Sequence, residues 1–151
     1  MPPLGLAWLA AQLEQANFPV EILDAHAERL GWDNLPERLK SYGAREVIGI
    51  TATTSLIGNA LALARMARAE FPEALIVLGG VHPTVLPEEV LAEHCVDLVV
   101  RGEGELTMLE IVSGVEIPTI KGISFRDGER FVHTPDRPLV SNLDDLAPPA
   151  Y

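Results

Sequence analysis

The sequence predicts an α/β domain with a doubly wound parallel sheet, a Rossmann-like or flavodoxin-like arrangement, from two observations. Segments with helical spacing alternate with short, almost wholly apolar segments along residues 4–112. Strands covered by helices on both faces are apolar throughout, and helices between strands give right-handed crossovers that place the strands parallel. The 151 residues suffice for one domain with a full core.

Each expected element has a local reason. Residues 4–16 repeat apolar residues at helical spacing, and residues 34–42 do the same with Pro36 in the first turn, where a helix tolerates it. Short segments rich in Val, Ile and Leu have the composition of buried strands. The predicted strands are 19–25, 46–52, 74–79 and 97–102, and the predicted helices are 4–16, 34–42, 56–71, 87–94 and 105–112.

The last part of the sequence has a different pattern. Residues 122–133 read as two strands joined by Asp127-Gly128, a dipeptide that favours a tight type I′ hairpin turn. Residues 134–151 are rich in proline and show no periodicity. We therefore expect a domain at residues 1–133 and, at residues 134–151, a linker toward a further domain.

The order of the elements indicates that one strand is missing. The sequence opens on a helix, whereas a flavodoxin-like domain opens on a strand in the middle of its sheet. Without that strand, the hydrogen-bond ladder would have a gap and the core would be exposed. We therefore expect the chain to be a fragment or to have a rearranged fold, in which its own hairpin fills the gap or a second copy pairs with an unpaired sheet edge as a homodimer.

Charge and cysteine content limit the partners. The formal net charge of -11 argues against nucleic acid and against an anionic membrane surface. The single cysteine, Cys95, excludes an intramolecular disulfide and the cysteine clusters that hold iron–sulfur centres. No apolar run is long enough to span a membrane, so we expect a cytoplasmic protein.

Candidate binding residues follow the predicted strands, because open parallel sheets bind ligands beyond the carboxyl ends of their strands. Asp24 and His26 follow the first strand, and the hydroxyl-rich sequence TATTS at 51–55 ends and follows the second. GGVHPT at 79–84 and RGEGE at 101–105 come at the next two strand ends. Three glycine- or hydroxyl-rich segments thus converge on one edge, with no obvious nucleophile or base.

Each segment also has a purely structural interpretation. A hydroxyl at the start of the 56–71 helix can cap it, and neighbouring glycines can serve helix packing or turns. A lone histidine or cysteine is more often solvated or buried than a ligand. The residues that this interpretation covers are Thr54, Ser55, Gly79, Gly80, Gly102, Gly104, His26, His94, His133 and Cys95.

Common cofactor motifs do not fit this edge. The run GEGEL at 102–106 lacks the third glycine of a dinucleotide fingerprint and has carboxylates where pyrophosphate would lie. No GxxxxGK[ST] sequence is present, and the strand at 46–52 leads into Thr53 instead of a phosphate-accepting Asp. Clustered His and Cys residues are too few for a zinc site.

At these residues the sequence resembles the cobalamin-binding domain of cobalamin-dependent radical S-adenosylmethionine enzymes, such as the anaerobic magnesium-protoporphyrin IX monomethyl ester oxidative cyclases. The resemblance covers nearly the whole chain, in the family's order. It is most specific at GGVHPTVLPEE and GEGE, and weaker at PPLGLAWLAAQLEQANFPVEILDA, GITATTSLIGNALALARMAR and IKGISFRDGERFVHTPDRPLVSNLDDLAPPAY.

The resemblance implies that this edge binds cobalamin. In the wider family a serine-containing loop and a Gly-Gly loop line the cleft for the nucleotide tail, and they match Ser55 and Gly79-Gly80. A side chain on Gly80 would block that cleft, so Gly80→Val is expected to abolish binding with little loss of fold. The implied cofactor-binding residues are Leu4, Gly5, Thr51, Thr53, Ser55, Leu56, Gly79, Gly80, Val81, His82, Pro83, Thr84, Gly102, Glu103, Gly104 and Glu105, with no catalytic or metal-binding residue.

Two features of related proteins are absent. Methionine-synthase-like domains have DxHxxG after the first strand, and its His binds cobalt; here Asp24 and His26 follow a later strand with the wrong glycine spacing, so His26 is not an expected ligand. The CxxxCxxC motif of the radical cluster is also absent. The chain alone is therefore not an expected catalyst. S-adenosylmethionine and a [4Fe–4S] cluster would belong to the radical domain of a parent methyltransferase or oxidative cyclase.

Two other functions remain open at the level of sequence. One is a non-enzymatic α/β interaction or regulatory module whose glycine loops are only structural. The other is a flavin- or nucleotide-binding domain that uses the same edge. The colour of the purified protein distinguishes them, because bound cobalamin is red, bound flavin is yellow and an interaction module is colourless.

Overall fold

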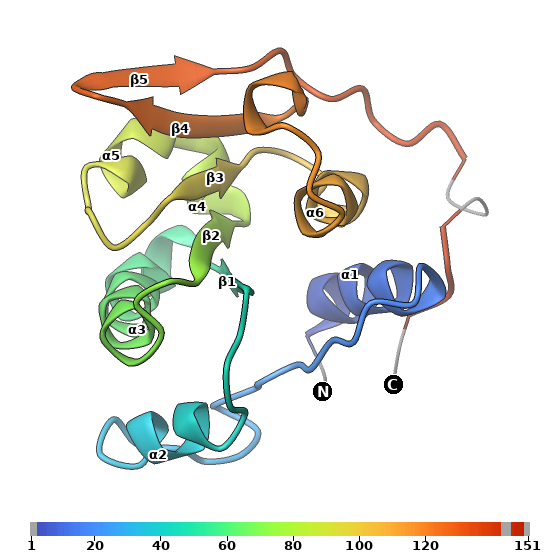
Figure 1. Cartoon of the computed structure of the whole chain (residues 1–151). Helices are drawn as coiled ribbons and strands as arrows, with labels where there is room; N and C mark the ends of the chain where they lie inside the picture. Colours follow the sequence, from blue (N-terminus) through green and yellow to red (C-terminus); the bar gives the residue numbers. More distant parts are fainter. Residues whose placement is uncertain (1–2, 143–145, 150–151) are drawn as a thin grey trace.

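The computed structural model describes residues 3–142 and 146–149, and its elements follow the expected α/β order (Figure 1). The helices are α1 (Leu4–Gln15), α2 (Leu35–Lys40), α3 (Ile57–Glu70), α4 (Val81–Val85), α5 (Pro87–Leu91) and α6 (Glu105–Val112). The strands are β1 (Val47–Thr51), β2 (Leu75–Gly79), β3 (Leu98–Val100), β4 (Ile123–Asp127) and β5 (Arg130–His133). Short 3-10 helices, η1 (Thr54–Leu56) and η2 (Ile117–Thr119), precede α3 and β4.

One sheet runs through the molecule in the order β1-β2-β3-β4-β5. The first three strands are parallel, and the hairpin β4–β5 continues the sheet in antiparallel orientation. The register pairs Thr51 with Gly79, so β1 and β2 end at the same level. The predicted parallel sheet with a C-terminal hairpin is therefore confirmed.

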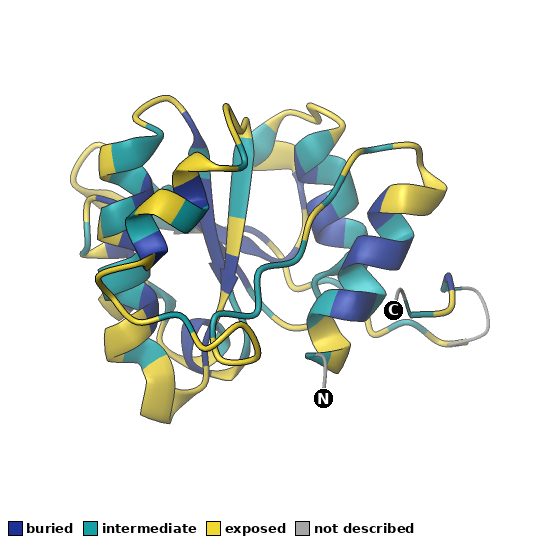
Figure 2. Cartoon of the chain, turned by 90° about the horizontal axis from the view of Figure 1, so that it is seen from below, coloured by how far each residue is buried: buried dark blue, intermediate teal, exposed yellow. Residues whose placement is uncertain are grey.

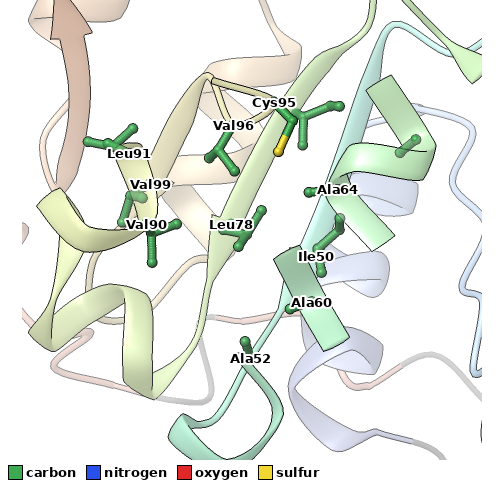
Figure 3. Close-up of a cluster of buried hydrophobic side chains, with 12 residues drawn as sticks. Ile50, Ala52, Ala60, Ala64, Leu78, Val90, Leu91, Cys95, Val96 and Val99 are labelled. Carbon is green, nitrogen blue, oxygen red and sulfur yellow. The ribbon is translucent and has the colours of Figure 1, made fainter. Parts of the chain in front are cut away.

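Helices cover both faces of the parallel part. On one face α3 and α5 pack on the strands through a buried cluster that includes Ile50, Leu78 and Val90 (Figure 3). On the other face α6 packs through Met108 and a second cluster, and α1 lies against α6. Figure 2 shows these buried surfaces turned inward between exposed helix faces. Each large aliphatic side chain buried in this way stabilises the fold by about 1.5–3 kcal/mol.

The predicted strand at 19–25 is wrong. This segment has no regular secondary structure and pairs with no strand of the described sheet. Asp24 instead opens a turn: its Oδ1 accepts from the N–H of Ala27 and its carbonyl from the N–H of Glu28, both at 2.9 Å. A strand needs a neighbour to satisfy its backbone groups, and no strand of the described sheet pairs with this segment.

β1 forms an open edge of the sheet. The N–H of Ala52 donates to the Gly79 carbonyl and the N–H of Leu75 to the Glu46 carbonyl, so the even-numbered residues of this segment face β2. Backbone groups alternate in direction along a strand, so those of Val47, Gly49 and Thr51 face away from the sheet. β5 forms the other edge and ends with His133.

Smaller differences from the sequence-based expectations concern helix ends and turns. The glycine loop contains an unexpected short helix, α4, and the helix predicted at 87–94 ends at Leu91. The hairpin turn is formed by Gly128 and Glu129, of which only Gly128 has a positive φ (63°), so the turn fits type II′ rather than type I′. Within the described residues, no helix has the length and apolarity needed to cross a membrane.

Candidate functional site

The three parallel strands deliver three segments to one edge of the sheet, which we call the rim: residues 51–56, 79–86 and 101–105. Backbone contacts join the first two segments, because the N–H of Ala52 bonds the Gly79 carbonyl at 2.9 Å and the N–H of His82 approaches the Ala52 carbonyl at 3.3 Å. The predicted convergence of these segments is thus present in the fold.

The first rim segment exposes a group of hydroxyls. Thr51, Thr53 and Ser55 are exposed, and the Ser55 Oγ lies in hydrogen-bond contact with the Thr53 Oγ1 at 3.1 Å. Neither η1 nor α3 has a side-chain cap, so the alternative role of Ser55 as a helix cap is wrong. Leu56 adds an apolar side chain, 53% exposed, beside these hydroxyls.

Gly79 and Gly80 serve different purposes. A Cβ on Gly79 would make ordinary contacts with Val100, the nearest at 3.7 Å. Gly80 has φ 100° and ψ -171°, a region essentially restricted to glycine, and a Cβ there would lie 2.7 Å from the Ala52 carbonyl oxygen. The expectation that Gly80→Val leaves the fold almost intact is therefore wrong, because the clash is with the backbone that follows β1.

α4 buries one polar side chain beneath the rim. His82 is 4% exposed, and neither ring nitrogen makes a hydrogen bond with a described residue, although Nε2 lies 3.3 Å from Glu89 Oε1. Pro83 is also buried, whereas Val81 and Val85 are exposed one helical turn apart. The structure thus places Val81 on the accessible side of the rim and His82 inside it.

The third rim segment is open at Gly102 and held by contacts at Glu103 and Gly104. Gly102 has φ 75° and no atom within 4 Å of a Cβ position. The Oε2 of Glu103 accepts from the N–H of Val140 at 2.9 Å. A Cβ on Gly104 would lie 3.8 Å from Leu9 Cδ1, so α1 reaches the rim there, and Glu105 begins α6.

Leu4 and Gly5 lie in the first turn of α1, about one turn before Leu9. Leu4 is 54% exposed, and a Cβ on Gly5 would meet no atom within 4 Å. These two residues therefore offer accessible surface on the helix that meets the third rim segment.

Asp24 and His26 are not part of the rim. They belong to the turn after residue 23, and His26 is exposed. His133 lies elsewhere, with Nδ1 2.7 Å from Ser124 Oγ and Nε2 2.9 Å from Glu88 Oε1, which supports its structural interpretation. No group of three or more His, Cys, Asp or Glu side chains in the described part of the chain could hold a metal ion.

Gly49 is an exposed position in β1 that the candidate residues from the sequence did not include. It lies in the middle of β1 yet is exposed, on the same face of the strand as Thr51. A Cβ there would lie 3.6 Å from Met108 Cε. The available signal was a glycine inside an otherwise apolar strand, which often marks a close approach to the backbone.

The chemistry of the rim suits binding. It presents neutral hydroxyls, bare backbone at Gly102 and exposed aliphatic side chains from Leu56 and Val81. Such a set fits cobalamin, whose corrin edge carries amide groups and whose body is largely apolar. The buried ring of His82 belongs to the second rim segment, and its Nε2 lies 3.3 Å from Glu89 Oε1.

Comparisons with known proteins extend this picture. Residues 1–112 match the family described as B12 binding domain. An uncharacterized methyltransferase of Pyrococcus horikoshii is 38% identical over 155 residues, which cover 99% of this chain and 33% of the relative. The anaerobic magnesium-protoporphyrin IX monomethyl ester cyclase of Cereibacter sphaeroides is 31% identical, over 97% of this chain and 25% of the relative. The chain thus spans a quarter to a third of the length of these relatives.

A solved structure shares the fold. The radical S-adenosylmethionine methyltransferase TsrM from Kitasatospora setae, with cobalamin and a [4Fe-4S] cluster bound, matches 99% of this chain and 28% of its own with a TM-score of 0.77. The sequence identity is 21%, so this likeness concerns the fold.

Proposed function

We propose that this chain, which belongs to the B12 binding domain family, holds cobalamin at its rim as one part of a larger radical S-adenosylmethionine enzyme. The observation that carries the proposal is the convergence of the three rim segments, with exposed hydroxyls on the first and open backbone on the third. Thr51, Thr53 and Ser55 would bond amide groups of the cofactor. Leu56 and Val81 would contact its apolar body.

Cobalamin, when bound, supplies a cobalt centre that can carry a methyl group or assist an oxidative ring closure. This chain's own residues position and shield the cofactor. With one cysteine, Cys95, which is buried, the chain has no ligand set for an iron–sulfur cluster. The cluster and S-adenosylmethionine would therefore bind a separate radical domain of the parent protein.

Residues 134–151 are the proposed linker to that domain, after a cobalamin-binding part at 1–133. Support comes from the relatives, a methyltransferase and a cyclase that are three to four times as long as the region they share with this chain. Among the described residues the first part of the segment is fixed on the domain: Arg137 pairs with Glu110, and Arg101 pairs with Asp136 at 2.6 Å.

The proposal includes a homodimer that forms through β1. The edge of β1 has free backbone groups and no charged residue between Val47 and Thr51 to discourage pairing. Sedimentation velocity at rising protein concentration tests the dimer.

The proposal also includes a cytoplasmic location. A single buried thiol suits a reducing compartment.

An absorbance titration of hydroxocobalamin tests cofactor binding, with Ser55→Phe and Ser113→Phe as a matched pair. Both serines are exposed, but Ser113 follows α6 at its far end. We expect saturable binding by the wild-type chain and by Ser113→Phe, and at least tenfold weaker binding by Ser55→Phe, because the ring would occupy the rim. Equal affinity of the two variants for hydroxocobalamin would show that Ser55 is not part of the binding site. A folded wild-type chain that binds no cobalamin would overturn the proposed function.

A further inference from the structure

One side chain joins the second rim segment to the third. The Oγ1 of Thr84 donates to the Gly80 carbonyl at 2.7 Å and accepts from the N–H of Gly102 at 3.0 Å. The first bond is local, since threonines in helices often bond the carbonyl four residues back. The second bond reaches 18 residues along the chain, to the segment that follows the next strand.

The two ends of this bridge differ in their other support. The Gly80 carbonyl also accepts from the N–H of Thr84 at 3.1 Å, so the hydroxyl matters most at the Gly102 end. Gly80 and Gly102 have positive φ angles of 100° and 75°. Strand pairing ends at Arg101, whose N–H still donates to the Gly122 carbonyl at 2.8 Å. The hydroxyl of Thr84 is thus the partner that the structure gives to the first N–H beyond the ladder.

We infer that Thr84 is a positioning residue that sets the separation of the second and third rim segments before cobalamin binds, an inference that rests on the proposed function. Its hydroxyl proton is committed to the Gly80 carbonyl, so Thr84 acts through the two segments and not by donating to the cofactor. A site that is already in its bound shape binds more tightly because less ordering accompanies binding.

Three variants of the full chain test this role in the hydroxocobalamin titration. Thr84→Val keeps the shape of the side chain and the backbone bond from residue 84 to Gly80, but removes both hydrogen bonds of the hydroxyl. Thr84→Ser keeps the hydroxyl, and Thr119→Val is the matched control. The Oγ1 of Thr119 also bonds a carbonyl of its own turn, that of Glu116 at 2.6 Å, but η2 is not part of the rim. We expect Thr84→Val to bind cobalamin about fivefold to tenfold more weakly, and the other two variants to bind like the wild type.

The hydrogen-exchange rate of the Gly102 amide, measured without cobalamin, reports directly on the hydrogen bond to Thr84. We expect faster exchange in Thr84→Val than in Thr84→Ser, and no change in Thr119→Val. Wild-type affinity in Thr84→Val, or equal weakening in Thr84→Ser, would overturn the positioning role. Equal exchange in both Thr84 variants would show that the bridge does not form. Failure of the folded wild-type chain to bind would instead refute the proposed function, and the exchange data would still decide the bridge.

Discussion

At position 80, both the backbone conformation and the packing require glycine. The backbone angles exclude a side chain, and the neighbouring Ala52 backbone leaves no space for one. The cofactor is not needed to explain this glycine. Its function is to let the chain turn sharply against the end of β1, which brings the second rim segment beside the first.

We therefore predict that Gly80→Ala lowers the free energy of unfolding by about 2–4 kcal/mol, as strain and overlap add. Gly102→Ala, at a positive φ with open space around it, should cost only about 1–2 kcal/mol. Urea unfolding of both variants measures the difference. Equal losses of unfolding free energy in the two variants would mean that the overlap with the Ala52 backbone relaxes at no energetic cost.

The free thiol of Cys95 reports on how well the hydrophobic core excludes solvent, because it is buried in that core. Burial raises the pKa of its thiol, and Glu93 adds to the shift, so the thiol stays protonated at neutral pH. We predict that Ellman's reagent labels native protein far more slowly than urea-unfolded protein at pH 7.5. The stabilising contribution is present below the unfolded thiol pKa and is lost as the pH rises through the higher folded pKa. Cys95→Ala should remove that alkaline part of the stability profile.

At the scale of elements, Arg68 fixes the edge of the sheet opposite the rim. It lies on α3 and donates to the Pro72 and Ala74 carbonyls, both at 2.8 Å, while its guanidinium also pairs with Asp97. Asp97 in turn accepts from the N–H of Ile76 at 2.8 Å. One side chain thus connects the end of α3 to the starts of β2 and β3.

Arg68→Lys should therefore destabilise the fold by about 1–2 kcal/mol, because an ammonium cannot reproduce the fork of bonds. Arg65→Lys is the matched control on the same helix. Its exposed pair with Glu93, at 2.9 Å, should contribute less than about 0.5 kcal/mol. Thermal unfolding followed by circular dichroism distinguishes the two, and equal effects would refute the central role of Arg68.

The elements also show what the sequence could and could not predict. β1, β2 and β3 were predictable because their composition already fits a doubly covered sheet. The segment at 19–25 has the same composition, but a strand also depends on a partner, which local composition does not record. α4 was missed because VHPTV has β-branched residues and a proline where a loop is expected. The bridge from Thr84 to Gly102 depends on tertiary contacts, so no local pattern indicates it.

For the whole molecule, the open edge at β1 predicts an uneven pattern of hydrogen exchange. The amides of Val47, Gly49 and Thr51 face away from the sheet, whereas those of Ile48 and Ile50 face β2. We expect the first group to exchange at least tenfold faster than the second, because only the second is bonded in the ladder. Slow exchange of Gly49 and Thr51 would show that another strand covers this edge in solution.

The two edges of the sheet also set the number of copies that can join. β5 has the charged side chain of Arg130 along its border, while the border of β1 is wholly uncharged. If two copies pair through β1, each copy uses its one uncharged edge strand. The result is a two-fold symmetric dimer that has no further uncharged edge strand with which to bind a third copy. Self-association of this domain is therefore expected to stop at two.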